Sequence, residues 1–537
     1  MRGISASAPG DNPREGAVVA RTLHSWTRGA WWAPEGRGLE VTDAVTGEPV
    51  AAVSSNGLDT AATVAYAREV GGPALRQSGF AERAALVKQL ALALKERRQE
   101  LIELSARTGA TAADASVDVD GGIGTALVFA GKGAKQLPDG NVLAEDDAEP
   151  LGKGGTFAGR HLLTPRRGVV VEINAFNFPV WGMLEKLAPA LIAGVPTIVK
   201  PATQTAYVTE HAVRILDETG LLPDGALQLV CGGIGDLLDH LGGQDLVSFT
   251  GSAGTAAKLR GHEAVTALSV RFNAEADSLN GSVLGPDAVP GTPEFELFAD
   301  ALVHEMTCKA GQRCTAIRRA LVPEELLDQV SDAVSDRLAK VVIGAPGAEG
   351  VTMGALVGQA QRGEVLAAVD RLKTAATVVT GGGPPAEVAG ADSTTGAFMA
   401  PTLLRCDDPA RPEPHTVEAF GPVSTLMGYR DPAHAVDLLA RGEGSLVASV
   451  VSHDDETVRE IVLGAAAHHG RILVLDRDDA GESTGHGTPM PQLVHGGPGR
   501  AGGGEEEGGL RAVAHHLQRT AVQAAPRVLD ALAGTAS

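Results

Sequence analysis

The residues best suited to chemistry are a cysteine and a glutamate. Cys314 lies in a run of small and polar residues, 311–316, that follows a helical pattern. A thiol in such a turn is a candidate nucleophile, because a thiolate adds to carbonyl carbon and forms a covalent intermediate. Glu275 follows an apolar strand pattern and is a candidate general base. Either residue alone is weak evidence, since free cysteines are commonly buried hydrophobes and glutamates are commonly solvated.

Four further motifs contain residues that could take part in catalysis or bind a ligand. They are Asn177-Phe178-Pro179, Lys200-Pro201-Ala202, Phe249-Thr250-Gly251-Ser252 and Glu418-Ala419-Phe420-Gly421-Pro422. Asn177 follows a strand pattern where the chain turns into a helix, so it is either an oxyanion donor or a turn or N-cap asparagine. The segment 249–252 ends a strand and opens a helix, where backbone N–H groups and the helix dipole favour phosphate.

The elements that must position these residues alternate between strands and helices. Apolar runs predict strands at 169–173, 196–199, 227–230 and 246–249, and amphipathic patterns predict helices at 180–193 and 207–219. This alternation with short connections predicts an α/β protein, with a parallel sheet covered on both faces in Rossmann-type order. Helical periodicity also covers 80–106, a helix from about 294 to 310 is expected to lead into Cys314, and a second α/β series follows from 320 to 450.

Composition excludes several classes of function. The chain has 537 residues, 44% of them hydrophobic, and a net charge of −21, which fits a globular protein of two or three domains and argues against binding nucleic acid or anionic membrane. Segment 1–16 lacks the apolar core of a signal peptide, and charges and prolines interrupt the most apolar region, 169–199. We therefore expect a soluble, cytoplasmic protein.

The four cysteines indicate neither a disulfide framework nor a structural metal. Cys231, Cys308, Cys314 and Cys406 form no C-x-x-C pair, and no histidine stands at zinc-finger spacing, so no metal is expected. Cys231 and Cys406 are interpreted as inert buried thiols and Cys308 as a packing residue or a neighbour of the pocket. A free thiol ionises only near pH ~8.5, so a helix N-terminus or a nearby cation must assist Cys314. Lys309 and Arg313 are the cations nearest in sequence.

In this order the five motifs resemble those of the aldehyde dehydrogenase superfamily. The resemblance implies that Cys314 is the nucleophile, Asn177 the oxyanion donor and Glu275 the base that activates water for thioester hydrolysis. Asp277 rivals Glu275 by spacing alone, and the resemblance selects Glu275. Most members have Glu-Leu-Gly-Gly at this place, whereas this chain has Glu-Ala-Asp-Ser at 275–278.

The resemblance also implies a nicotinamide cofactor. The cofactor-binding residues that it implies are Lys200, Thr203, Phe249, Thr250, Gly251, Ser252, Glu418 and Phe420. Lys200 matches the lysine that touches the adenosine ribose, and Glu418 matches the glutamate that binds the nicotinamide ribose. Many NAD-preferring members carry a glutamate where this chain has Thr203. We therefore predict that NADP is preferred, with NAD possible as a cofactor.

The closer resemblance is to the PaaZ/PaaN-type branch of phenylacetate degradation. It rests on the strings 173–179, 181–189, 275–280, 309–319 and, above all, 483–506. It implies oxidation of a CoA-linked ring-cleavage semialdehyde, of the 3-oxo-5,6-dehydrosuberyl-CoA semialdehyde type, to the carboxylic acid. The alternatives are a 3,4-dehydroadipyl-CoA semialdehyde dehydrogenase of benzoyl-CoA degradation, a generic aldehyde dehydrogenase, and a non-catalytic scaffold.

The resemblance also implies the organisation of the chain. The expected parts are an N-terminal and Rossmann-type cofactor-binding domain (17–274) with an oligomerisation hairpin at about 146–167, a catalytic thiol domain (275–480), and a C-terminal Gly-rich loop with an oligomerisation strand (481–537). We expect a homo-oligomer formed through 159–165 and 519–522. Bifunctional members of the branch carry a C-terminal hydratase domain that does not fit here, so a separate enoyl-CoA hydratase is the expected partner. Arg318, Arg319 and Arg500 are either ligands of coenzyme A phosphates or members of surface or structural ion pairs.

Overall fold

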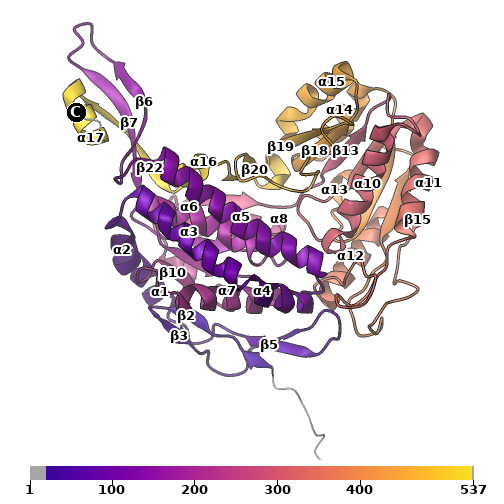
Figure 1. Ribbon diagram of the computed structural model, residues 1–537, viewed down its shortest axis with the longest axis horizontal. Coiled ribbons are helices and arrows are strands. Elements are labelled where there is room, and N and C mark those ends of the chain that lie inside the picture. The colour runs from indigo at the N-terminus through magenta and orange to yellow at the C-terminus, as the bar shows by residue number, and fades with distance from the viewer. Residues whose placement is uncertain (1–19, 535–537) are drawn as a thin grey trace, which may run out of the picture.

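The computed structural model describes residues 20–534, and it has two α/β lobes and a projecting arm (Figure 1). The expectation about segment 1–16 and the first three residues of the expected N-terminal domain lie outside the described residues. Within residues 20–534, no helix combines the length and the apolar character that crossing a membrane requires.

The first lobe is built on a seven-stranded sheet. Its strands, in spatial order, are β12 (Arg271–Glu275), β11 (Leu246–Thr250), β8 (Val170–Ile173), β9 (Thr197–Lys200), β10 (Leu227–Leu229), β2 (Ser25–Thr27) and β3 (Ala30–Trp32). The strands from β12 to β10 are parallel, and β2 and β3 are antiparallel additions at one edge. The predicted parallel sheet is confirmed, and each predicted strand overlaps an observed one.

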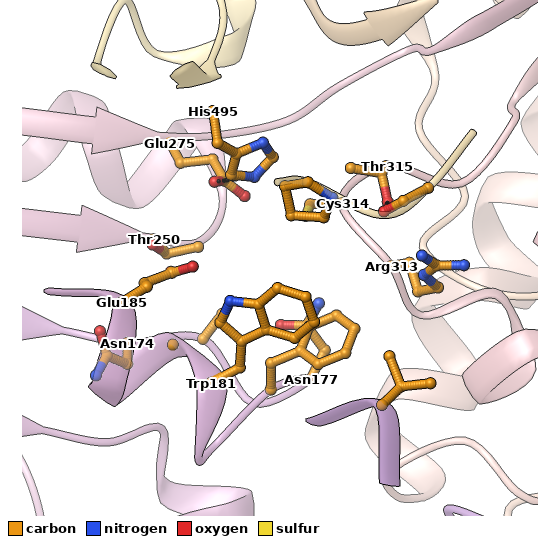
Figure 2. A pocket seen from close by; sticks show the side chains of 16 residues that line it. Asn174, Asn177, Trp181, Glu185, Thr250, Glu275, Arg313, Cys314, Thr315 and His495 are labelled. Carbon is orange, nitrogen blue, oxygen red and sulfur yellow. Dashed lines mark hydrogen bonds and ion pairs between the residues drawn. The ribbon is translucent and has the colours of Figure 1, made fainter. Parts of the chain in front are cut away.

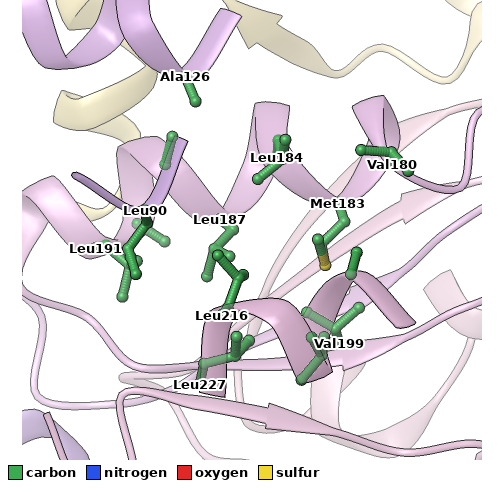
Figure 3. Close-up of a cluster of buried hydrophobic side chains, with 14 of the residues drawn as sticks. Leu90, Ala126, Val180, Met183, Leu184, Leu187, Leu191, Val199, Leu216 and Leu227 are labelled. Carbon is green, nitrogen blue, oxygen red and sulfur yellow. The ribbon is translucent and has the colours of Figure 1, made fainter. Parts of the chain in front are cut away.

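A helical layer packs on this sheet and contains the core of the lobe (Figure 3). Its helices are α3 (Phe80–Glu96), α4 (Arg98–Ser105), α5 (Ala112–Gln136), α6 (Trp181–Ala193) and α7 (Ala206–Glu218). Met183, Leu187 and Leu191 on α6 are almost fully buried, which is why this helix reads as apolar throughout. Gly194 ends α6 with φ 83°, a conformation that costs glycine little.

The long helix α5 fixes the start of α6, the region that carries Asn177. A capping box formed by Thr111 and Asp114 starts α5. Farther along α5, the Asp118 carboxylate accepts backbone N–H bonds from Val180 (3.2 Å) and Trp181 (2.8 Å). These bonds satisfy N–H groups at the start of α6 that have no partner within the helix. The turn before α6 is therefore held by a separate helix.

The second lobe is built on another seven-stranded sheet. Its order is β15 (Thr377–Thr380), β16 (Thr402–Cys406), β17 (Val423–Tyr429), β14 (Arg319–Pro323), β13 (Gly281–Leu284), β18 (Ser445–Val451) and β19 (His469–Leu475). All neighbours are parallel except β15, which runs antiparallel to β16. The main helices of this lobe are α10 (Pro293–Thr307), α11 (Leu327–Leu338), α12 (Gln359–Leu372), α14 (Pro432–Ala440) and α15 (Asp455–Ala465).

The remaining elements are short. They are the sheet β1 (Arg21–Thr22), β5 (Pro49–Val53) and β4 (Leu39–Thr42), and the helices α1 (Thr60–Tyr66), α2 (Gly72–Arg76), α8 (Ala253–Arg260), α9 (Glu263–Thr266) and α13 (Glu413–Thr416). Of these, α8 bears directly on the site, because it begins immediately after Ser252.

The chain leading to Cys314 differs from the expected helix of 294–310. Helix α10 ends at Thr307, and Lys309 and Ala310 both take φ of 50°. Gly311 follows with φ 67°, and a Cβ there would lie 2.2 Å from the carbonyl oxygen of Gly421. Tight packing against the 421–422 turn therefore forces the chain out of the helix, so Cys314 lies in a turn.

The C-terminal segment joins the two lobes and forms the arm. It contains β20 (Val494–Gly496), β21 (Glu505–Glu507), α16 (Leu510–His515), β22 (Leu517–Ala524) and α17 (Pro526–Ala533). Strand β22 pairs with β7 (Ala158–Pro165), which pairs with β6 (Leu143–Pro150), and this sheet projects from the first lobe (Figure 1). The Gly-rich stretch 485–509 passes very close to other backbone: a Cβ on Gly504 would meet the Ala274 oxygen at 2.5 Å. Close approach explains several of these glycines, whereas Gly485 and Gly503 have a positive φ and no atom within 4 Å of an added Cβ.

Candidate active site

Two cavities meet at Cys314. One is clearly larger than the other. Both are lined by Asn177, Glu275 and Cys314, so the three residues predicted to be catalytic lie at the junction (Figure 2). They come from the turn before α6, the end of β12 and the turn after α10. A reagent in either cavity can therefore reach the same sulfur.

The larger cavity contains every residue predicted to bind the cofactor. Its lining includes Lys200, Thr203, Phe249, Thr250, Gly251, Ser252, Glu418 and Phe420. The C-terminal ends of β8, β9 and β11 open into it, which is where parallel α/β sheets bind ligands. The structure thus brings together residues that are more than 200 positions apart in the sequence. Their individual roles stay predictions.

The smaller cavity approaches Cys314 from the other side. Its remaining walls come from α5, α6 and the segment before β20, and they include Val117, Phe178, Trp181, Gly487 and Pro489. These side chains are mostly apolar, which suits an organic substrate more than a free ion. Because none of these five lines the larger cavity, the two openings are chemically distinct.

The Cys314 backbone is fixed, whereas its thiol is partly exposed. The Asn280 amide donates to the Cys314 carbonyl oxygen at 2.7 Å, and the Thr315 hydroxyl donates to the Gly487 carbonyl oxygen at 2.8 Å. Neither expected activator is in place. The Arg313 guanidinium is paired with Glu305 at 3.1 Å, and the Lys309 ammonium lies over the Phe178 ring, 4.5 Å from its centroid. Arg313 lines the smaller cavity and its charge interacts with Cys314, but its guanidinium is already bound to Glu305, and Cys314 starts no helix.

The cation beside the thiol is His495, a residue that sequence reasoning missed. His495 lies on β20, and its side chain is 4% exposed. Its Nε2 lies 2.9 Å from Oε2 of Glu275, and it also hydrogen-bonds Cys314. A carboxylate oxygen of Glu275, the sulfur of Cys314 and a ring nitrogen of His495 all lie within 4.8 Å of one another. The only signal in the sequence was a lone histidine beside Gly496-Gly497, where absent side chains let another surface approach.

Electrostatics couples these three groups. Burial raises the pKa of the Cys314 thiol, and the Glu275 charge raises it further, to about 12, against the opposing effect of His495. Burial also raises the pKa of the Glu275 carboxyl, but the charge and hydrogen bond of His495 outweigh it and hold that pKa below its ordinary value. For His495, the Glu275 charge overcomes burial and raises the imidazole pKa well above its usual range. The resting state is therefore a thiol beside a carboxylate–imidazolium pair.

The structure separates Glu275 from its rival Asp277. The Asp277 carboxylate accepts the Ala253 N–H at 2.8 Å, at the start of α8, and lines only the larger cavity. Glu275 is 3% exposed, lines both cavities and hydrogen-bonds the thiol. By position, Glu275 is the carboxylate that can act at an acyl group on Cys314.

Asn177 is one of two asparagines that line both cavities, the other being Asn174. It lies before Phe178 and Pro179 in the turn that Asp118 fixes, and it is 7% exposed. An amide held at the junction of the two cavities suits an oxyanion donor, and this role of Asn177 stays a prediction.

A second ionic group lies behind Glu275. The Lys186 ammonium contacts Glu185 at 2.6 Å and Glu506 at 3.0 Å, and both carboxylates are buried. Burial raises the pKa of Glu185 to about 8, in spite of Lys186. Glu185 also lines the smaller cavity, so its carboxyl group borders the site. Sequence reasoning gave these residues no role.

Other residues considered in the sequence prove structural. Arg318 donates to the carbonyl oxygens of Gly311, Arg313 and Gly421, and Arg319 donates to those of Leu279, Leu438 and Leu439. Arg500 donates to carbonyl oxygens of the 415–416 turn. Within residues 20–534 none of the three arginines forms an ion pair, so the expectation of structural ion pairs is not met, and their expected contact with coenzyme A stays a prediction. Cys231, Cys308 and Cys406 are buried and line neither cavity.

Comparisons with known proteins agree with this geometry. A model described as "Aldehyde dehydrogenase family" matches residues 31–521. The chain is 48% identical, over 89% of its length and 93% of the relative's, to 3,4-dehydroadipyl-CoA semialdehyde dehydrogenase from Aromatoleum evansii. It is 54% identical to Protein MaoC from Klebsiella aerogenes, over 33% of this chain and about half (52%) of that protein. A crystal structure of betaine aldehyde dehydrogenase from Staphylococcus aureus has the same fold, with a TM-score of 0.80 at 22% identity over 94% of this chain and 97% of that chain.

Proposed function

The chain belongs to the aldehyde dehydrogenase family, and from this premise we propose that it oxidises a CoA-linked semialdehyde to the carboxylic acid with a nicotinamide cofactor. The observation that carries the proposal is the position of Cys314, whose sulfur is open to two cavities and lies beside a carboxylate. One cavity holds the predicted cofactor residues, and the other is left for the aldehyde. A scaffold without activity would not need a thiol beside a carboxylate where two cavities meet.

In the first half of the reaction, the Cys314 thiol transfers its proton to the Glu275 carboxylate. The resulting thiolate attacks the aldehyde carbon, and the carbonyl oxygen becomes an alkoxide. The Asn177 amide and the backbone N–H of Cys314 donate to that oxygen, and a bound nicotinamide supplies the hydride acceptor. Each oxyanion donor of this kind contributes roughly a hundredfold to a thousandfold in rate. The product of this half is a thioester on Cys314.

In the second half, water must hydrolyse the thioester. Glu275 first loses to solvent the proton that it took from the thiol, and Glu185, which lines the same cavity, can relay that proton in its ionised form. Glu275 then takes a proton from water, the hydroxide adds to the thioester carbon, and the sulfur leaves as thiolate. The net products are the carboxylic acid and one proton, together with the reduced cofactor.

The residues of the larger cavity fit a dinucleotide. Ser252 caps α8, whose first turn faces the cavity with N–H groups suited to a pyrophosphate. Glu418 is half-buried, and its carboxylate accepts the Ser278 N–H at 3.3 Å, which leaves lone pairs that can accept ribose hydroxyls. Lys200 forms no ion pair with any residue between 20 and 534, which leaves its ammonium for the adenosine end. Asp277 binds one N–H of α8, so the cofactor must share this helix terminus with a carboxylate.

Two substrates fit the proposal, and one comparison favours the second. The sequence motifs point to the 3-oxo-5,6-dehydrosuberyl-CoA type, whereas the relative that matches nearly end to end is named for 3,4-dehydroadipyl-CoA semialdehyde. Both are open-chain semialdehydes with a coenzyme A tail. Contacts between the protein and the coenzyme A tail can lower the barrier of the reaction, because their binding energy offsets the cost of orienting the aldehyde carbon.

Steady-state kinetics on matched substrates test the function. We expect kcat/KM for each CoA-linked semialdehyde to exceed that of the free semialdehyde by at least about tenfold, because the tail supplies remote binding energy. The production of reduced cofactor is followed by absorbance, with both semialdehydes measured in parallel. Equal kcat/KM for the free and linked forms would indicate a generic aldehyde dehydrogenase. No turnover of any aldehyde would leave only the scaffold.

We also propose that NADP is preferred over NAD. Thr203 is neutral and lies in the larger cavity near the end of β9, where the only lining cation is Lys200. Replacing Thr203 with glutamate is expected to shift the ratio of kcat/KM for NADP to that for NAD by at least about tenfold toward NAD. A carboxylate there accepts bonds from both ribose hydroxyls and repels a 2′-phosphate.

The neighbouring residue provides the matched control for this charge. Gln204 lines the same cavity and is more exposed, so Gln204→Glu adds the same charge one position away. Its effect on the ratio should be much smaller, because solvent screens an exposed charge. An equal shift in both variants would show a general charge effect, and a wild-type preference for NAD of tenfold or more would contradict the proposal.

The arm formed by β6, β7 and β22 is the surface through which we propose that copies of the chain associate. It contains both segments expected for oligomerisation, and Leu151, Phe157 and Leu532 are exposed large apolar side chains on it or beside it. The expected domain boundaries, the separate enoyl-CoA hydratase and the absence of a metal stay predictions.

A further inference from the structure

His495 has a role in the reaction that the family motifs do not assign. We propose that His495 is a positioning residue whose single Nε2 proton alternates between two acceptors, the Glu275 carboxylate and the Cys314 sulfur. This inference rests on the proposed function, because it takes Cys314 as the nucleophile and Glu275 as the base. It adds a third member to the pair and explains how a thiol becomes ionised although it starts no helix and the basic residues near it in sequence are paired with other groups.

The first argument is geometric. Nε2 of His495 is 2.9 Å from Oε2 of Glu275. The carboxylate oxygen, the Cys314 sulfur and the imidazole nitrogen all lie within 4.8 Å of one another. Nδ1 of the same ring has no hydrogen-bond partner within residues 20–534, so Nε2 is the atom that serves both neighbours. One N–H cannot donate fully to two acceptors at the same time. It must favour whichever acceptor carries the charge.

The second argument is that the protein fixes the ring in this place. Strand β20 pairs with β21, with His495 opposite Glu506. At the next residue, Gly496, φ is 141°, and a Cβ there would lie 2.1 Å from the Gly504 oxygen. The backbone beside His495 therefore tolerates glycine alone. His495 lines the smaller cavity and not the larger one, so it reaches the sulfur without entering the cofactor's space.

Charges from three directions act on this imidazole. Glu275 on β12 and Cys314 in the turn after α10 contact it, and Glu507 on β21 interacts with its charge. Lys186 on α6 acts on Glu275 from behind and is itself held by Glu506. Burial opposes the charge on His495, but the negative charges of Glu275 and Cys314 outweigh it and favour the protonated ring.

The proton balance is simple. At rest the imidazolium donates to the Glu275 carboxylate and the thiol is neutral. When the thiol proton moves to Glu275, the carboxyl becomes neutral, the sulfur becomes negative, and the Nε2–H bond turns to the sulfur. The same happens when the thiolate leaves the acyl group at the end of the cycle. His495 neither gains nor loses a proton, so it stabilises the charge on sulfur in both halves of the reaction.

Alkylation of Cys314 by iodoacetamide tests this without any aldehyde. The full chain is treated over a range of pH, and the rate at the Cys314 peptide is measured by mass spectrometry. In His495→Gln we expect the pH midpoint to rise by at least about one unit, which slows alkylation tenfold at a fixed pH below it. In Glu275→Gln we expect alkylation to be faster than in the wild type. Without the competing carboxylate, the Nε2–H of His495 can donate to the Cys314 sulfur and stabilise the thiolate. The double variant should lose that acceleration.

His516→Gln is the matched control, since His516 is also a fully buried histidine of the C-terminal segment but lines neither cavity. Thermal unfolding checks that each variant folds. If His495→Gln does not fold, the Glu275→Gln variant still tests the proposal. Slower alkylation in Glu275→Gln than in the wild type would overturn it. An unchanged pH profile in a folded His495→Gln would overturn it too. Failure of the proposed function is separate: it shows as no aldehyde turnover by the wild type, whatever the alkylation profile.

Discussion

Replacing Cys314 with alanine is expected to reduce the production of reduced cofactor by at least roughly 10⁴-fold, because no other group in the two cavities can form the covalent intermediate. The neighbouring hydroxyl of Thr315 donates to the Gly487 carbonyl oxygen and is a far weaker nucleophile than a thiolate. The variant should fold, with a change in unfolding free energy below about 1 kcal/mol, since the lost sulfur is small and partly exposed. Activity is measured by absorbance and folding by thermal unfolding.

Cys308 gives the matched control for the lost thiol. It lies six positions before Cys314 but is buried and lines neither cavity, so Cys308→Ala should keep nearly all the activity. Normal turnover by Cys314→Ala would remove the assignment of the nucleophile. Equal losses in both variants would point to a general requirement for intact packing of this turn.

Replacing Glu275 with glutamine is expected to separate the two halves of the reaction. Acylation still proceeds, because His495 stabilises the thiolate and the thiol proton can leave to water. Hydrolysis then lacks its base, so steady-state turnover should fall by about 10²- to 10⁴-fold. Rapid mixing should show a burst of one reduced cofactor per active site, and intact mass spectrometry should show the acyl group retained on the protein.

Asp277→Asn tests the rival carboxylate. Asp277 holds the N–H of Ala253 at the start of α8, so its loss should act on the KM for the cofactor and leave thioester hydrolysis intact. A burst in Asp277→Asn, together with steady turnover in Glu275→Gln, would reverse the two roles. Full steady-state activity in Glu275→Gln would show that hydrolysis needs no carboxylate at this position.

Much of the fold could be predicted from local patterns. The strands of the first sheet are continuous apolar runs because both of their faces are buried, and Gly194 marks the end of α6 by its left-handed conformation. The family recognised from the motifs is confirmed. The pattern failed at 308–311, where helical periodicity continues in the sequence but packing against the 421–422 turn unwinds the chain. The periodicity of 80–106 also predicted one continuous helix, whereas the structure has two, α3 and α4, which are separated at Arg97.

The sequence by itself determined which residue types were available: a thiol, a carboxylate, an amide and a phosphate-binding turn in the order typical of one family. Only the tertiary structure decided what lies beside the thiol. Lys309 and Arg313 are near Cys314 along the chain, yet each binds elsewhere, whereas His495 comes from the far end of the chain and contacts it. The reason is physical, because local patterns reflect contacts a few residues apart, while the ionisation of a buried group depends on every charge within a few ångströms.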